Sequence, residues 1–200
     1  MKINFKLAIA LLMLPMVAFA QDKTADEYKN EGNAFVKEKK FKEALDSYQQ
    51  AIKLWGDSVD VATVYNAGDC ARRVEEYETS NKLFQQSIDL NYKKADYATY
   101  YIAENYGKLN LVDERIAQLE KGFEQYKEGK VASIIKKALT KEYVKKANAQ
   151  IIEGNKLIGE NKDAKAVFKV AKEWNDRALS VDPQSEDATK MAEIIKEQLK

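Results

Sequence analysis

Small and apolar residues recur in three similar stretches of this chain, each displaced from the one before by about 35 residues. The first stretch carries them at Tyr28, Gly32, Phe35, Phe41, Ala44, Tyr48, Ala51 and Leu54, the second at Val64, Gly68, Ala71, Tyr77, Ser80, Phe84, Ser87 and Leu90, and the third at Thr99, Ala103, Tyr106, Val112, Arg115, Leu119 and Gly122. The spacing within each stretch predicts two amphipathic helices separated by a break. One such pair cannot bury its apolar face alone, so successive pairs are expected to share a continuous core.

The pattern places three repeats and their helices along the chain. The repeats span about 25–58, 61–94 and 96–129. In the first repeat we expect helices from Asp26 to Glu38 and from Phe41 to Leu54. The third repeat departs from the pattern because the long Arg115 stands where a small residue is expected. We therefore expect its helices to pack differently there.

The remaining residues form an irregular fourth unit, 130–183, followed by a final helix, 185–200. The fourth unit has no strong turn signal until Asn161, which predicts one long helix ending near Gly159 and a second helix that returns. Ser185 is expected to cap the last helix through its side chain. The apolar positions of that helix lie on one face, and its other face is charged, as the end of a stacked array requires.

These repeats resemble the tetratricopeptide repeat (TPR), a helix-turn-helix module of about 34 residues. The resemblance is strongest in the first two repeats and extends over 21–200. It implies an all-α solenoid of stacked antiparallel helix pairs, closed by a C-terminal capping helix. It also implies a protein that binds other proteins or peptides. An ordinary helical bundle or coiled coil is the alternative, although sustained heptads are absent.

The resemblance further implies that the first helix of each pair lines a concave, tyrosine-rich groove for a partner. By register, the groove residues are Lys29, Asn33, Val36, Tyr65, Asn66, Asp69, Arg73, Tyr97, Tyr100, Tyr101, Glu104 and Lys108. Tyrosine is enriched at protein interfaces because it offers a large, stiff, amphipathic surface. The alternative for any one of these tyrosines is that it packs against the preceding helix as part of the core.

Some tetratricopeptide co-chaperones hold the C-terminal carboxylate of a partner peptide in a clamp of Lys, Asn and Arg side chains. Lys29, Asn33 and Asn66 resemble that clamp. Tyr97 and Tyr101 depart from it, because they occupy its two basic positions in the third repeat. The loss of both cations removes most of the charge complementarity to a carboxylate.

Composition argues against several other functions. The chain has no His, only one Cys (Cys70), and no phosphate-binding loop, nucleophile motif or metal-ligand cluster. The formal net charge is +1, and acidic and basic residues are interspersed. The chain therefore offers no positive electrostatic potential that would attract nucleic acid. We therefore expect no enzymatic activity, no cofactor, no metal and no nucleic-acid partner.

The N-terminal residues 1–20 read as a secretory signal peptide. Lys2 and Lys6 precede an apolar stretch from Leu7 to Leu14, and Ala18 and Ala20 form a small-x-small cleavage site. We expect cleavage after Ala20 and a periplasmic or secreted bacterial protein without an integral membrane span. An uncleaved anchor is the alternative.

Three functions remain open. The first is an exported scaffold or adaptor, the second a chaperone-like binder of extended peptides or C-termini, and the third a structural subunit of an envelope or secretion assembly. The sequence does not predict the oligomeric state.

Overall fold

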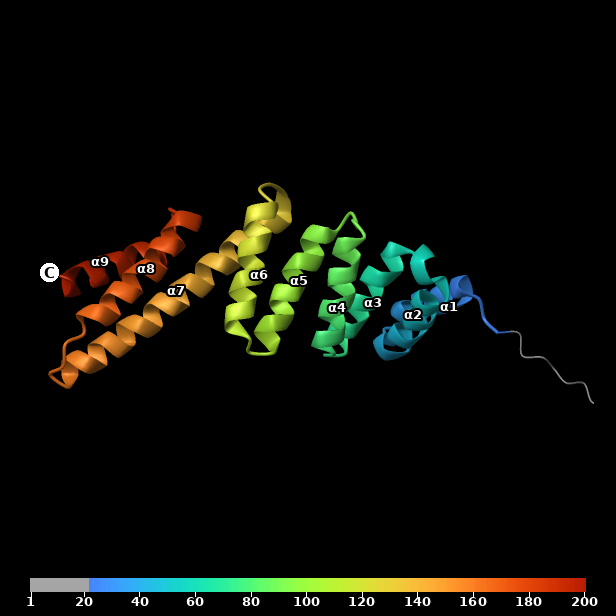
Figure 1. Cartoon of the computed structure of the whole chain (residues 1–200), viewed down its shortest axis with the longest axis horizontal. Coiled ribbons are helices and arrows are strands. Elements are labelled where there is room, and N and C mark those ends of the chain that lie inside the picture. Colours follow the sequence, from blue (N-terminus) through green and yellow to red (C-terminus); the bar gives the residue numbers. More distant parts are fainter. Residues whose placement is uncertain (1–21) are drawn as a thin grey trace, which may run out of the picture.

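The computed structural model describes residues 22–200, so the predicted signal peptide lies outside the described residues. Within that range the chain is all helical, with stacked antiparallel helix pairs in an elongated array, as predicted (Figure 1). The elements are α1 (Ala25–Lys37), α2 (Phe41–Trp55), η1 (Gly56–Ser58), α3 (Val61–Arg73), α4 (Tyr77–Asp89), α5 (Ala95–Lys108), α6 (Val112–Gln125), α7 (Gly129–Gly159), α8 (Lys165–Val181) and α9 (Glu186–Gln198).

Side-chain caps fix where several helices begin. Thr24 forms a capping box with Glu27 at the start of α1. Asp60 caps α3 by accepting a hydrogen bond from the backbone N–H of Ala62. Ser185 accepts one from the backbone N–H of Ala188 at the start of α9, which confirms the predicted cap.

The same tight turn joins the two helices of each of the first three pairs. Lys39, Glu75 and Asn110 occupy equivalent positions there and all have positive φ, 61°, 62° and 60°. The backbone N–H of the residue after each donates a hydrogen bond to the carbonyl five positions earlier, at 2.9 Å in every case. The pairs are Lys40 to Phe35, Glu76 to Ala71, and Leu111 to Tyr106. This bond satisfies a carbonyl that the helix end leaves unpaired. The repeat in sequence is therefore also a repeat in backbone geometry.

Small residues in the first helix of a pair admit a large ring from the second helix. A Cβ built on Gly32 would come within 2.6 Å of the Tyr48 ring, and one built on Gly68 within 3.0 Å of the Phe84 ring. Tyr48 is 1% exposed and Phe84 is fully buried. These two glycines thus set how closely α1 approaches α2 and α3 approaches α4.

In the third pair the two helices pack differently at the equivalent place, as its sequence predicts. A Cβ on Gly107 would lie 2.0 Å from Nη1 of Arg115, so the guanidinium occupies the space beside this glycine. Arg115 pairs there with Glu104 at 2.8 Å and with Glu142 of α7 at 3.2 Å. The arginine therefore links three helices at the place where the first two repeats bury small side chains.

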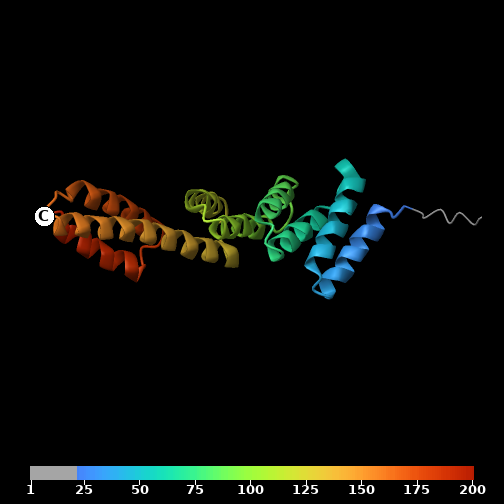
Figure 2. The same ribbon diagram turned by 90° about the horizontal axis from the view of Figure 1, so that it is seen from below.

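The long helix predicted for the fourth unit is confirmed as α7, which has 31 residues. Near its start, Val131 and Ile135 share a core with Ile116 and Leu119 of α6. Farther along, Gly154 admits the Phe168 ring of α8, since a Cβ there would lie 2.7 Å from the ring. Helix α7 therefore belongs to the repeat array at one end and to a group with α8 and α9 at the other (Figures 1 and 2).

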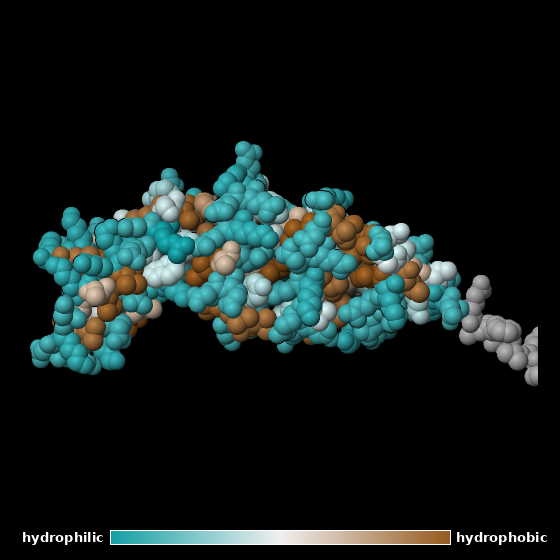
Figure 3. Space-filling view, in the orientation of Figure 1, coloured by the Kyte–Doolittle hydropathy of each residue, from teal (hydrophilic) through white to brown (hydrophobic). Residues whose placement is uncertain are grey.

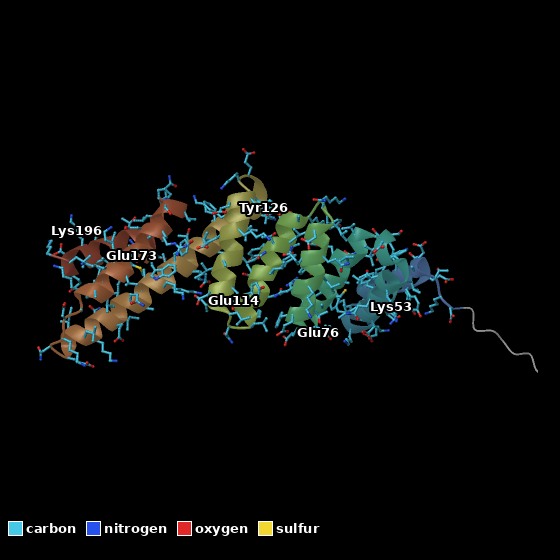
Figure 4. All side chains as sticks on the ribbon, in the orientation of Figure 1. Lys53, Glu76, Glu114, Tyr126, Glu173 and Lys196 are labelled. Carbon is cyan, nitrogen blue, oxygen red and sulfur yellow. The ribbon has the colours of Figure 1, made fainter. Side chains whose placement is uncertain are left out.

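The face shown in Figure 3 is predominantly hydrophilic, and apolar residues show there mainly in the seams between helices. Ion pairs bridge some of these seams, as Lys42 of α2 does with Glu76 at the α3–α4 turn, at 2.6 Å. Figure 4 shows Glu76 and Glu114 at the ends of neighbouring hairpins. Among residues 22–200, no helix combines the length and the apolarity needed to cross a membrane.

Candidate functional site

The candidate groove begins on α1, where Lys29 already has a partner. Its Nζ lies 2.7 Å from Oδ2 of Asp60 and 5.8 Å from the centre of the Trp55 ring. Burial raises the pKa of Asp60, but hydrogen bonds from Lys29, Thr63 and the backbone of Ala62 outweigh it, so the pKa falls below its ordinary value. Lys29 therefore stabilises the start of α3 in this structure.

Asn33 and Asn66 come together from α1 and α3 around the phenol of Tyr48. The Tyr48 hydroxyl donates a 2.8 Å hydrogen bond to Oδ1 of Asn33. Burial raises the pKa of Tyr48 to about 12, with a further contribution from Cys70, while a hydrogen bond with Asn66 acts in the opposite direction. Both amides that resemble the clamp therefore lie against the phenol of the buried Tyr48.

Tyr65 lies mainly in the core. It is 7% exposed, and its ring packs edge-on to Phe84 with centroids 5.3 Å apart and against Tyr92 at 5.0 Å. Its pKa is raised, chiefly by burial. This is the core alternative stated for the tyrosines, and little of this side chain is available to a partner.

Asp69 organises the two arginines at the end of α3. It pairs with Arg72 at 2.9 Å and with Arg73 at 2.7 Å. The guanidinium of Arg73 lies over the Phe41 ring at 4.8 Å, which turns it towards the first repeat. The guanidinium of Arg72 lies 4.5 Å from the centre of the Tyr101 ring. A cation therefore sits on the face of one of the tyrosines that replace the basic clamp residues.

Three tyrosines of α5 form a half-buried aromatic cluster. The ring centre of Tyr101 lies 6.3 Å from that of Tyr97, 5.9 Å from that of Tyr100 and 5.5 Å from that of Phe84. Tyr97 and Tyr100 also pack against the core shared by α6 and α7. Part of each tyrosine is thus packed in the core and part is exposed to solvent. Both predictions for these residues, groove surface and core, therefore hold in part.

A hollow of about 270 Å³ opens at this cluster, between α3, α4 and α5. It is lined by Arg72, Tyr77, Tyr100, Tyr101, Glu104, Asn105 and Lys108. Four predicted groove residues therefore share one cavity. Glu104 is held there by Arg115, and Lys108 is exposed, with no ion pair in the described part of the chain.

Sequence reasoning missed Arg72, Tyr77 and Asn105. The repeat spacing does predict Arg72. The second repeat follows the first by 36 residues, as Tyr65 follows Lys29, so the position equivalent to Val36 is Arg72 and not Arg73. Tyr77 belongs to the core pattern of the second helix and reaches the cavity from its first turn. Asn105 is 1% exposed and donates hydrogen bonds to Ser80 and Asn81, while its Oδ1, beside the hollow, has no hydrogen-bond partner among residues 22–200.

The groups that line this hollow are phenols, two cations, one carboxylate and an amide, which suit hydrogen bonding, stacking and charge pairing. Burial raises the pKa of Tyr100, and the neighbouring Glu104 adds to this effect while Arg115 opposes it. Within residues 22–200, no group of three or more Cys, Asp or Glu side chains is placed to hold a metal ion.

A comparison with known families matches residues 25–57 to the tetratricopeptide repeat. Protein unc-45 homolog B of Homo sapiens and of Mus musculus is 33% identical to this chain over 110 residues, which are 52% of the chain. The match covers only 12% of the length of each of these relatives.

Two solved bacterial structures share the fold over most of the chain. A TPR repeats protein from Bacteroides fragilis is 20% identical, with a TM-score of 0.57, and the match covers 86% of this chain and 98% of that one. A tetratricopeptide repeat protein from Parabacteroides merdae is 14% identical, with a TM-score of 0.53, and covers 87% of this chain and 59% of its own length. The predicted fold class, an α-solenoid of stacked repeat helices, is confirmed.

Proposed function

We propose that this chain is an exported interaction module that binds a protein or peptide along α1, α3 and α5, with its main contact at the hollow around Tyr101. The observation that carries the proposal is the convergence of Arg72, Tyr100, Tyr101 and Lys108 from two repeats on one open cavity. Half-buried tyrosines beside cations are typical of the residues that anchor a partner.

The same cavity indicates the chemistry of the partner. An apolar or aromatic side chain fits against Tyr100 and Tyr101, and an acidic one can approach Lys108. A five-residue carboxylate clamp is a poorer fit, because Lys29 is bound to Asp60 and Tyr48 engages both clamp amides. Arg72, stacked on Tyr101, restores one cation near a position where the clamp pattern lacks it.

Affinity capture with matched variants tests the proposal. The purified protein is used as bait in an envelope extract of the source organism, next to Tyr101→Ala and Lys108→Glu. Lys121→Glu, an exposed lysine of α6, is the matched control. We expect one stoichiometric partner that is retained by the wild-type protein and the control and lost by both groove variants.

Two outcomes would contradict this scheme. A partner held equally by Lys108→Glu and Lys121→Glu would exclude the hollow as the contact. A diverse set of unfolded clients would favour a chaperone-like binder over an adaptor.

Export rests on the sequence pattern of residues 1–20 and has its own test. Mass spectrometry of the protein recovered from the periplasm or the medium is expected to give an N-terminus at Gln21. An intact N-terminus in the cytoplasmic fraction would refute export without affecting the groove.

A further inference from the structure

A second hollow, of about 330 Å³, lies between α8 and α9, away from the helices that form the candidate groove. Its apolar side comes from Ala192 and Ile195 of α9 and from Leu199, the residue that directly follows this helix. Ile195 is 2% exposed, while Ala192 and Leu199 are half-buried. This side of the hollow therefore offers apolar surface to a ligand.

The opposite side contains a buried amide without a partner. Asn175 of α8 is 1% exposed and lines the hollow, and its Oδ1 has no hydrogen bond within the described residues. Buried polar atoms in proteins are nearly always paired. An N–H group of a ligand in the hollow would satisfy this acceptor.

The rim of the hollow is cationic. Lys172, Lys196 and Lys200 surround it, with Asp176 as the one acidic group. Asp176 is paired with Lys172 at 2.6 Å and Lys200 with Glu197 at 2.5 Å, whereas Lys196 has no ion pair with any residue from 22 to 200. Figure 4 shows Lys196 at the C-terminal end of the molecule. The rim therefore favours an anionic group at the mouth of the hollow.

We propose that this hollow binds the C-terminal residue of a peptide whose last side chain is apolar. Such a residue supplies all three complements at once: a side chain for the apolar wall, a backbone N–H for Asn175, and a carboxylate for Lys196 and its neighbours. The volume lies near the lower end of the range of about 300–1,000 Å³ found for ligand pockets, which suits one or two residues. This site is separate from the proposed groove and does not depend on it.

Nuclear magnetic resonance titration of the purified, methyl-labelled protein tests this proposal. The probes are the peptide Gly-Ser-Gly-Ser-Phe with a free C-terminus, the same peptide amidated, and a version ending in Asp. We expect the free peptide to shift the methyl signals of Ala192, Ile195 and Leu199. Amidation or the terminal Asp should weaken binding at least fivefold.

Two substitutions on the same helix provide a matched pair. Lys196→Glu reverses a rim charge, whereas Lys190→Glu makes the same change at an exposed lysine outside the hollow. We expect the first to weaken binding at least fivefold and the second to leave it unchanged. Because both positions are exposed, neither variant should prevent folding. Asn175→Leu, which removes the amide, gives a second test if its spectrum shows a folded protein.

Three results would overturn the proposal. These are equal affinity for the free and amidated peptides, equal effects of the two lysine substitutions, or methyl shifts centred on Ala98 and Ile102 near the groove tyrosines. The last result would assign the peptide to the concave groove and leave the α8–α9 hollow without a ligand.

Discussion

Replacement of Gly32 by Ala tests the close approach of α1 and α2 on which the first repeat depends. On helix propensity alone the change should stabilise α1 by about 1 kcal/mol. The new Cβ, however, would lie 2.6 Å from two atoms of the Tyr48 ring. That ring is 1% exposed, and its hydroxyl is bound to Asn33 at 2.8 Å, so it has little room to move.

The balance of these effects gives the expected sign. Overpacking of a core costs about 1–3 kcal/mol, and a weakened Tyr48–Asn33 hydrogen bond costs about 1 kcal/mol more. After the gain in propensity, which offsets the weakened hydrogen bond, Gly32→Ala should destabilise the protein by about 1–3 kcal/mol. For a chain of this size, that corresponds to a fall in Tm of about 2–4 °C per kcal/mol.

Gly159 provides the control, because a Cβ there would meet nothing within 4 Å. Gly159→Ala should leave stability unchanged or raise it by up to about 1 kcal/mol. Urea unfolding followed by circular dichroism measures both variants. The double variant Gly32→Ala/Tyr48→Leu should cost less than the sum of the two single changes, because the smaller side chain relieves the contact. If Gly32→Ala proved as stable as Gly159→Ala, Tyr48 would not pack against Gly32 and the repeat register would be wrong.

Three other substitutions follow from the same structure. Ala44 is fully buried, so Ala44→Arg should lower the free energy of unfolding by about 3 kcal/mol, and an unchanged Tm would refute the packing. The lowered pKa of Asp60 means that its ion pair with Lys29 stabilises the fold above the unfolded-state pKa and is lost as pH falls through the folded-state pKa. Asp60→Asn should therefore cost less than about 1 kcal/mol at neutral pH and nothing in strong acid, as urea unfolding at several pH values would show. Gly107→Ala should displace the Arg115 guanidinium and leave the buried carboxylate of Glu142 less well paired, which offsets the gain of about 1 kcal/mol in helix propensity; urea unfolding should show little net change, and a gain as large as that of Gly159→Ala would contradict the tight contact.

The helices were largely predictable because their signals are local and repeated. The ends of α2 and α7 agree with the spacing of apolar residues and with the turn residues that follow. The cap at Ser185 was predictable for the same reason, since a cap depends on residues within one turn. The sequence predicted that the packing at Arg115 departs from that of the first two repeats. It did not predict the partner Glu142, because the repeat pattern does not fix how α7 is aligned against α6.

The candidate groove was less predictable than the fold. A helix position predicts a face, but the exposure of a side chain on that face depends on the neighbouring helix. Tyr65 and Tyr101 are both on the first helices of their repeats, yet Tyr92 closes over the former, while a hollow remains beside the latter. Arg72 was missed because a difference of one residue turns a side chain by about 100° around a helix.

The pairing of charges within the groove limits how a partner can be bound. Lys29 is held by Asp60, Asp69 holds Arg72 and Arg73, and Glu104 is held by Arg115. A partner that used these half-buried charges would first have to displace an internal counterion, and exchanging one ion pair for another returns little free energy. The groups that a partner can use without such exchange are the tyrosine rings and Lys108. The proposed groove is therefore better suited to select shape and aromatic contact than net charge, which distinguishes it from a carboxylate clamp built on unpaired lysines.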